Sequence, residues 1–286
     1  MITTIRNYAS LVKFEHTIFA LPFALIGFTL AITHTTFEFS WELLVAVLLC
    51  MVFARNTAMG FNRYLDREID AENPRTAQRE IPAGIISARN AAAFVAINAI
   101  LFIATTWFIN QLVFFLSPIA LIVVMGYSYT KRITPLCHFV LSAGLALAPI
   151  GAYLAVTGKF ALVPVLFSFI VFFWVSGFDI IYASQDVEFD RNKGLNSVPV
   201  LLGVKKALRL SALVHVLAAI MVVWAGIDMH ANWLYWTGAA IFIGLLTYQQ
   251  SIVKHNDLSK VGLAFGTTNG VASVIFAVFV ITSLYI

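Results

Sequence analysis

The sequence contains nine runs of mostly apolar residues, each close to the roughly 20 residues that a helix needs to cross a bilayer. With soft boundaries, they lie at residues 15–34, 42–62, 90–109, 112–130, 137–156, 161–184, 208–227, 232–250 and 262–285. Of the 286 residues, 60% are hydrophobic and 11% are charged, and a water-soluble domain could not bury that much apolar surface. The sequence therefore predicts an all-α, polytopic membrane protein with nine transmembrane helices, forming a single domain over residues 1–286.

The basic residues predict the orientation of these spans. With nine spans, the N-terminus and the loops that follow even-numbered spans share one side of the membrane. That side carries every Lys and Arg among the 18 except Lys159. Because loops rich in Lys and Arg stay in the cytoplasm, we expect the basic side to face the cytoplasm of a cell whose inner (plasma) membrane holds the protein. Topology and attraction to anionic lipid would explain most of these charges, and we expect no nucleic-acid partner and name no protein partner.

Two groups of acidic residues follow the second and sixth spans at helical spacing. The first group lies at i, i+4 and i+8 and consists of Asn62, Asp66 and Asp70. The second lies at i, i+3, i+7 and i+11 and consists of Asp179, Tyr182, Asp186 and Asp190. At about 1.5 Å per residue, the first group would form one stripe about 12 Å long if the helix continues past the membrane. Both groups end an even-numbered span, so both should reach the same membrane surface.

Such stacked acids repel each other and need a cation. Pairing with local arginines, such as Arg63, Arg67 or Arg191, is one solution. A second is Mg²⁺, which takes a few carboxylates and shares phosphate oxygens of a substrate. Two such ions would balance Asp66, Asp70, Asp186 and Asp190, and an incoming diphosphate of charge about −3 would need cationic side chains as well. The candidates for that role are Arg63, Arg67, Arg75, Arg79, Lys131, Arg132 and Lys193.

A metal pair held by carboxylates at a membrane rim suits an amphiphile with a diphosphate head and a long hydrocarbon tail. The tail could lie between apolar helices that are rich in Phe, which contributes 25 residues. We therefore expect a central cavity among the helices that opens to the cytoplasmic side.

At these residues the sequence resembles the UbiA family of intramembrane aromatic prenyltransferases. Its N-x-x-x-D-x-x-x-D motif is matched by the first group, and its D-x-x-Y-A-x-x-D-x-x-x-D motif by the second. "YSYTKR" at residues 127–132 is similar to its Y-x-x-x-K-R loop, and "REIPAGIIS" to its R-P-x-P-x-G patch, although Glu80 replaces the first Pro. "KFEHTIFALPFA" resembles a 4-hydroxybenzoate polyprenyltransferase-like branch, some of whose members prenylate a dihydroxynaphthoate for menaquinone instead.

The resemblance implies nine helices, Mg²⁺ as cofactor, and transfer of a polyprenyl group from polyprenyl diphosphate to an aromatic carboxylic acid in quinone biosynthesis. It implies that Asn62, Asp66, Asp186 and Asp190 hold metal and diphosphate, with Asp70 as a further ligand. Asp66 and Asp186 are then catalytic, because the metal stabilises the departing diphosphate. An allylic cation would form and be attacked by an electron-rich ring.

Residues on the acceptor side follow from the same interpretation. Asp179 lies one to two turns deeper than the metal acids, so it could orient or deprotonate the aromatic acceptor, or be a buried structural carboxylate. Arg132 or Lys131 could bind the acceptor carboxylate, or belong to an ordinary basic loop. Tyr127 and Tyr182 could flank the cation or simply pack. His16 and Arg55, near span ends, are further candidates for the acceptor pocket, and His138 is expected at the membrane interface.

Two other classes are possible. A secondary transporter would also have many spans, but it places its site near the membrane midplane, where this chain has almost no acids. A CDP-alcohol phosphotransferase also uses spaced aspartates, but in one continuous motif, whereas here the acids are divided between two spans. Within the prenyltransferase class, a haem-type or chlorophyll-type acceptor has less support.

Overall fold

The computed structural model describes the backbone of residues 2–286, and the side chains of residues 6–13 and 17–286. These residues form helices and no β-strand. The first half comprises α1 (Ile2–Leu11), η1 (Phe14–Phe19), α2 (Leu21–Thr33), α3 (Trp41–Leu65), α4 (Arg67–Glu72), α5 (Ala88–Trp107), α6 (Gln111–Thr130) and α7 (Cys137–Thr157). The second half comprises α8 (Leu162–Ala183), η2 (Ser184–Asp186), α9 (Val187–Asn192), α10 (Val198–Leu202), α11 (Val204–Asp228), α12 (Trp233–Ile252), η3 (Leu263–Thr268) and α13 (Asn269–Ser283).

All nine predicted spans are helical, and among the described residues seven helices are long and apolar enough to cross a membrane. These are α3, α5, α6, α7, α11, the continuous segment Leu162–Asn192 that begins with α8, and the segment Leu263–Ser283 that ends with α13. The other two predicted spans are weaker. Residues 15–34 form η1 and the 13-residue α2, and residues 232–250 form α12, which is 20 residues long but is not among the seven. Nine crossings therefore stay a prediction.

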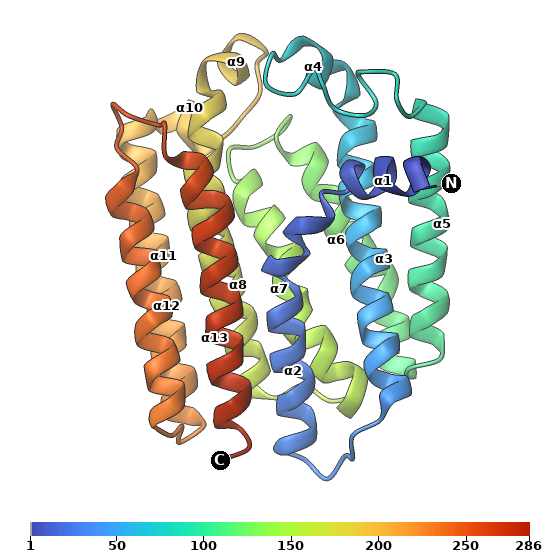
Figure 1. The fold of residues 1–286 in the computed structure, drawn as a ribbon, viewed down its shortest axis with the longest axis vertical. Coiled ribbons are helices and arrows are strands. Elements are labelled where there is room, and N and C mark those ends of the chain that lie inside the picture. Colours follow the sequence, from blue (N-terminus) through green and yellow to red (C-terminus); the bar gives the residue numbers. More distant parts are fainter. Residues whose placement is uncertain (1) are drawn as a thin grey trace.

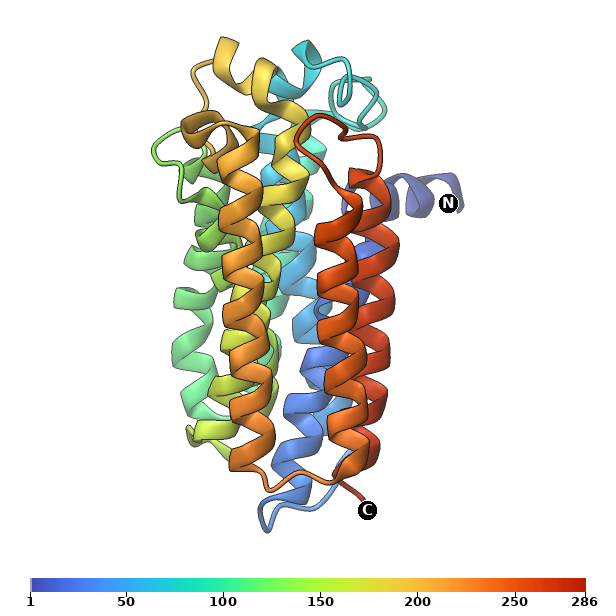
Figure 2. The ribbon, with the colours of Figure 1, turned by 90° about the vertical axis from the view of Figure 1, so that its left-hand side faces the viewer.

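The long helices run up and down in one bundle, and the two long connections lie together at one of its ends (Figure 1). This end carries α4, α9 and α10, whereas the C-terminus lies at the opposite end. Helix α1 lies across the bundle axis and projects from its side (Figures 1 and 2). The predicted basic side and the end that carries α4 and α9 are therefore the same end.

The core is built around α8, whose Trp174 is fully buried. Its indole packs against Phe23 of α2, Phe178 of α8 and Phe242 of α12, with ring centroids 5.2–5.8 Å apart. Its Nε1 donates a hydrogen bond to Asn269 Oδ1 at 2.9 Å, because a buried indole N–H needs an acceptor. Large apolar side chains on the outer helices are exposed, as expected for a surface that faces lipid. The rigid central helix α8 carries Asp179 and Tyr182 near its end.

Close helix approach depends on small residues at two places. A Cβ on Gly27 of α2 would lie 2.0 Å from the carbonyl oxygen of Pro149 in α7. A Cβ on Gly177 of α8 would lie 2.1 Å from Cδ2 of His215 in α11. Both contacts bring neighbouring helices against α8 and α7, and so fix the helices that carry the polar end.

Candidate active site

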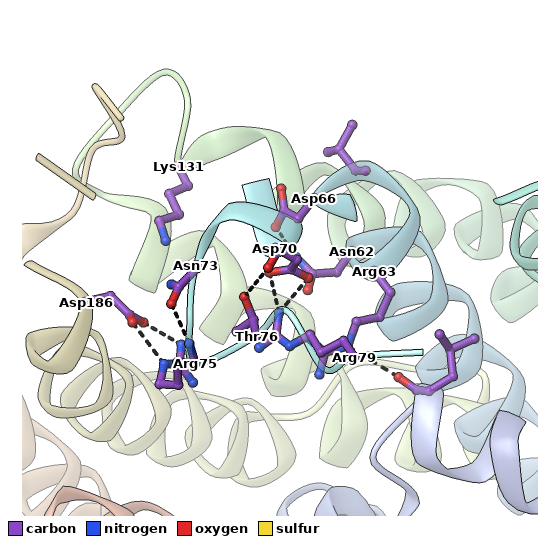
Figure 3. A network of polar contacts seen from close by, with 12 residues as sticks. Asn62, Arg63, Asp66, Asp70, Asn73, Arg75, Thr76, Arg79, Lys131 and Asp186 are labelled. Carbon is purple, nitrogen blue, oxygen red and sulfur yellow. Dashed lines mark hydrogen bonds and ion pairs between the residues drawn. The ribbon is translucent and has the colours of Figure 1, made fainter. Parts of the chain in front are cut away.

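A cavity of about 200 Å³ lies at the end of the bundle where the two long connections meet. Its walls come from the end of α3, the α4–α5 connection, α6, α7, α8, α9 and the loop before α10. Both acidic groups contribute to it, as do basic residues from two loops (Figure 3). The predicted site residues that line it are Asn62, Asp66, Asp70, Arg75, Arg79, Tyr127, Lys131, Arg132, Asp179, Tyr182 and Asp186. Segments that are far apart in the sequence therefore meet at one cavity.

The first acidic group lies across a break between two helices. Helix α3 ends at Leu65, Asp66 has non-helical dihedral angles (φ −89°, ψ 5°), and α4 begins at Arg67. The backbone N–H of Asp66 still bonds to Asn62 O at 2.9 Å, and that of Asp70 bonds to Asp66 O at 2.7 Å. This i to i−4 pattern keeps the three side chains close to one face, although the single continuous helix we expected is interrupted.

Each acid of the first group has polar partners. Asp66 accepts a hydrogen bond from Asn62 Nδ2 at 3.0 Å and pairs with NH2 of Arg132 at 2.8 Å. The buried Asp70 accepts from NH1 of Arg79 at 2.7 and 2.8 Å. Burial raises the pKa of Asp66 above its ordinary value, because desolvation penalises the charged form more than Arg132 favours it.

The second group approaches from α8, η2 and α9. Asp186 accepts hydrogen bonds from Nε of Arg75 at 2.9 Å and from NH2 of the same arginine at 2.5 Å. NH1 of Arg75 donates to the hydroxyl of Tyr182 at 2.8 Å, and the guanidinium lies 5.3 Å from the centre of that ring. Burial is the largest single influence on Arg75 and lowers its pKa, but the hydrogen bonds and charge interactions with Asp186 and Tyr182 together outweigh it and leave the pKa raised. Asp190, 1% exposed, lies behind the cavity wall, where its Oδ1 is 2.7 Å from Lys131 Nζ.

Asp66, Asp70, Asp186 and Asp190 are therefore each paired with a basic side chain, as in the first of our two alternatives, although three of the four partners are distant in the sequence rather than local. The arginines that we named for it were Arg63, Arg67 and Arg191, whereas the structure uses Arg75, Arg79, Lys131 and Arg132. Within the described residues, no three His, Cys, Asp or Glu side chains are grouped closely enough to form a metal cage.

The donor chemistry nevertheless fits Mg²⁺. This ion prefers oxygen ligands and commonly takes one or two carboxylates, with water and substrate phosphate completing its shell, so a cage of three acids is not required. Asn62 and Asp66 offer an amide oxygen and a carboxylate on one wall, and Asp186 offers a carboxylate on another. Each carboxylate is at present paired with an arginine, Asp66 with Arg132 and Asp186 with Arg75, and an anionic substrate group could take over either arginine.

Besides Asp190, four basic residues among the predicted binding residues do not line the cavity. Arg63 is buried and its Nε donates to Leu11 O at 3.4 Å. Arg67 donates to Tyr64 O and pairs with Glu68. Lys193 pairs with Glu72 of α4. Arg55 donates to the carbonyl oxygens of Val12 and Lys13 at 3.3 and 2.8 Å, so it ties the end of α1 to α3.

The side chain of His16 lies outside the described residues.

Four acceptor-side candidates line the same cavity. Asp179, Tyr127, Tyr182 and Arg132 all line it. The expectation that His138 lies at the membrane interface is wrong: its side chain is 3% exposed and lines the same cavity, with Nδ1 2.6 Å from Asp179 Oδ2. The signal that could have found it is the rule that flagged His16, namely an ionisable residue at the start of a span.

The chain matches known proteins over nearly its whole length. A family model described as the UbiA prenyltransferase family matches residues 20–283. A 4-hydroxybenzoate octaprenyltransferase of Aliivibrio fischeri (strain MJ11) is 28% identical over 245 residues, covering 86% of this chain and 85% of the relative. The apo structure of a UbiA homolog from Aeropyrum pernix K1 has a TM-score of 0.80 and 29% identity, covering 95% of this chain and 97% of that one.

A UbiA homolog from Archaeoglobus fulgidus bound to GPP and Mg²⁺ has the same fold, with a TM-score of 0.75 and 24% identity, covering 98% of this chain and 100% of that one. The family match spans well over half of the chain, and it agrees with the position of both acidic groups at one cavity. The protein is therefore an integral membrane prenyltransferase that belongs to the UbiA prenyltransferase family.

Proposed function

We propose that the protein is a Mg²⁺-dependent enzyme that transfers a polyprenyl group from polyprenyl diphosphate to a 4-hydroxybenzoate-like acceptor and releases diphosphate. The reaction would serve quinone biosynthesis, with the protein crossing the inner membrane nine times and the cavity facing the cytoplasm. One observation carries the proposal: carboxylates and cationic side chains of both motifs line a single cavity at the basic end of an apolar bundle. The curated relative from Aliivibrio fischeri, named for this acceptor, supports it.

The proposed metal ligands are Asn62, Asp66, Asp70, Asp186 and Asp190, of which all but Asp190 line the cavity. When bound there, Mg²⁺ would neutralise the charge that develops on the diphosphate as its bond to the prenyl group breaks. Arg75, Arg79 and Lys131 line the cavity and would bind the diphosphate oxygens by charge-assisted hydrogen bonds. Each of these three cations is paired with an acid at present, so binding of diphosphate would require it to exchange that partner for a diphosphate oxygen.

The bond-making steps follow from the same arrangement. The C–O bond of the prenyl diphosphate breaks, its electron pair leaves with diphosphate, and an allylic cation remains. A ring carbon of the acceptor supplies the electron pair for the new C–C bond, and the ring then loses a proton. Tyr127 and Tyr182 would flank the cation, and Asp179 would orient the acceptor or take a proton from it. Arg132 would bind the acceptor carboxylate. The buried site limits the access of water to the cation.

The test is to offer the purified protein geranyl diphosphate with 4-hydroxybenzoate, 1,4-dihydroxy-2-naphthoate or 1,4-dihydroxy-6-naphthoate, with and without Mg²⁺. Product mass and released diphosphate are measured. We expect prenylated 4-hydroxybenzoate only with Mg²⁺. If only a prenylated naphthoate forms, the acceptor in the proposal changes from 4-hydroxybenzoate to a dihydroxynaphthoate. Absence of all three products, with solute movement across vesicles that needs no Mg²⁺, would contradict the proposal and favour transport.

A further inference from the structure

The carboxylate of Asp179 is held by a histidine from a neighbouring helix. His138, at the start of α7, places Nδ1 2.6 Å from Asp179 Oδ2 on α8. The His138 side chain is 3% exposed and that of Asp179 is 19% exposed, and both line the cavity. The described residues offer no hydrogen-bond donor to Asp179 Oδ1. One carboxylate oxygen is therefore tied to the protein, and the other is left for a molecule in the cavity.

The far side of the imidazole fixes its tautomer. The backbone N–H of Val198 donates to His138 Nε2 at 3.2 Å. A nitrogen that accepts a hydrogen bond carries a lone pair, so in the neutral ring the proton resides on Nδ1 and points at Asp179. Val198 is the first residue of α10, and Ser197 caps this helix by accepting from Val200 N at 3.3 Å. The donor to His138 is thus part of an ordered turn.

The charges that line the cavity explain why the Asp179 carboxylate needs the contact with His138. Arg75, Arg79, Lys131 and Arg132 line the same cavity as Asp179. Each of these cations already pairs with an acid, and an untethered Asp179 carboxylate would compete with those acids for them and turn away from the acceptor. The Nδ1 contact of His138 holds the carboxylate against that pull.

We propose that His138 is a positioning residue, whose Nδ1–H, fixed by the Val198 N–H, holds Asp179 with Oδ1 directed at the aromatic acceptor. The inference rests on the proposed acceptor-side role of Asp179 and deepens it. It assigns to the first residue of α10 a part in positioning Asp179, although Val198 does not line the cavity. The general logic is that a base works best when a third group orients it.

The first experiment compares His138→Leu with His138→Asn. Leucine removes the donor, whereas the Asn side chain can place an amide N–H near the position of Nδ1. We expect His138→Leu to lower kcat/KM for the acceptor by about 10- to 100-fold, since misplacement of a reacting group by about 1 Å costs on that order. The KM for prenyl diphosphate should change little, and His138→Asn should recover most of the loss. Equal impairment by both variants, or a loss confined to the prenyl diphosphate, would overturn the inference.

A second experiment leaves the imidazole in place and removes only its fixing donor. Proline suits position 198, because it is the first residue of α10 and the preceding Ser197 is already extended (φ −154°, ψ 162°). With ¹⁵N-labelled histidine, NMR of the wild type should show His138 with Nε2 unprotonated and Nδ1 protonated. In Val198→Pro the proton should no longer be confined to Nδ1. Acceptor turnover should fall by roughly 3- to 10-fold, which is less than the loss expected for His138→Leu. A wild-type Nε2–H tautomer would overturn the inference even if His138→Leu does not fold.

A double-mutant cycle separates this inference from the proposed function. If His138 acts only through Asp179, His138→Leu should cost less than about twofold when Asp179 is already Asn. A full multiplicative loss would assign His138 another role. Near-normal activity of Asp179→Asn alone would end the proposed role of Asp179 as well. Loss in Asp179→Asn with normal activity in His138→Leu would end only the inference.

Discussion

Arg75 and Asp186, 111 positions apart in the sequence, form a bidentate ion pair across the cavity, with N–O distances of 2.9 and 2.5 Å. The same guanidinium donates to Tyr182 and lies against its ring, so it is held on two sides. A diphosphate that enters the cavity would therefore meet an arginine already directed into it by the protein.

We expect Arg75→Gln to raise the KM for prenyl diphosphate by roughly 10- to 100-fold, because a hydrogen bond to a charged group is worth about 1.5–3 kcal/mol. The KM for the aromatic acceptor should change much less. The matched control is Arg89→Gln, since Arg89 is exposed in the first turn of α5. Steady-state kinetics with each substrate varied in turn measure both KM values. An effect on the acceptor alone would place Arg75 elsewhere in the reaction.

Asp66→Ala and Asp186→Ala should each lower kcat by at least about 10³-fold, since several kcal/mol of charge stabilisation at the diphosphate would be lost. Both proteins should still insert, as judged by membrane fractionation and gel filtration in detergent. Glu188→Ala is the control, because Glu188 lies on α9 between the acidic positions but is exposed. Near-normal turnover in either Asp variant would show that the metal assignment is wrong.

The raised pKa of Asp66 predicts a pH-dependent stability difference without metal. A raised pKa means that the folded state disfavours the charged carboxylate, so this residue contributes stability at low pH and loses it as pH rises through the folded-state pKa. In EDTA, Asp66→Asn should therefore unfold at a higher temperature than the wild type near pH 8. The gap should close as the wild-type residue is protonated. Thermal unfolding from pH 8 down to about pH 4, close to the ordinary pKa of an Asp carboxyl, measures this.

Adding Mg²⁺ with pyrophosphate should reverse the order at pH 8, because only the wild type offers the carboxylate. A gap that widens on acidification would contradict the sign of the shift.

Gly177→Ala should destabilise the protein by about 1–3 kcal/mol, the usual cost of overpacking. A methyl group there would lie 2.1 Å from the ring of His215, which is itself held by Trp174 O and Gln250. Gly244→Ala is the matched control, because Gly244 is an exposed α12 residue with no atom within 4 Å of an added Cβ. Thermal unfolding in detergent should show a clear decrease for the first variant and no decrease for the second. Equal behaviour of the two would mean that the α8–α11 contact can relax.

The positions of the helices could be predicted because they depend on local properties of the chain. A run of about 20 apolar residues satisfies its own backbone hydrogen bonds as a helix and buries itself in lipid without reference to the rest of the fold. The break at Asp66 could not be predicted in the same way. The i to i−4 hydrogen bonds of Asp66 and Asp70 are kept across the break, so the local spacing is the same as in a continuous helix, whereas the ion pair of Asp66 with Arg132 joins it to a loop distant in the sequence.

The sequence by itself determined the apolar bundle, the charged end and the spacing of the acids, since each follows from composition and helical period. Only the tertiary structure decided which cation meets which acid. Arg132 meets Asp66, Lys131 meets Asp190 and Arg75 meets Asp186, although arginines nearer in the sequence were available. It also brought His138 to Asp179. The physical reason is that such pairs form between side chains of different helices and loops, and helix packing, which no local pattern encodes, sets the distances between them.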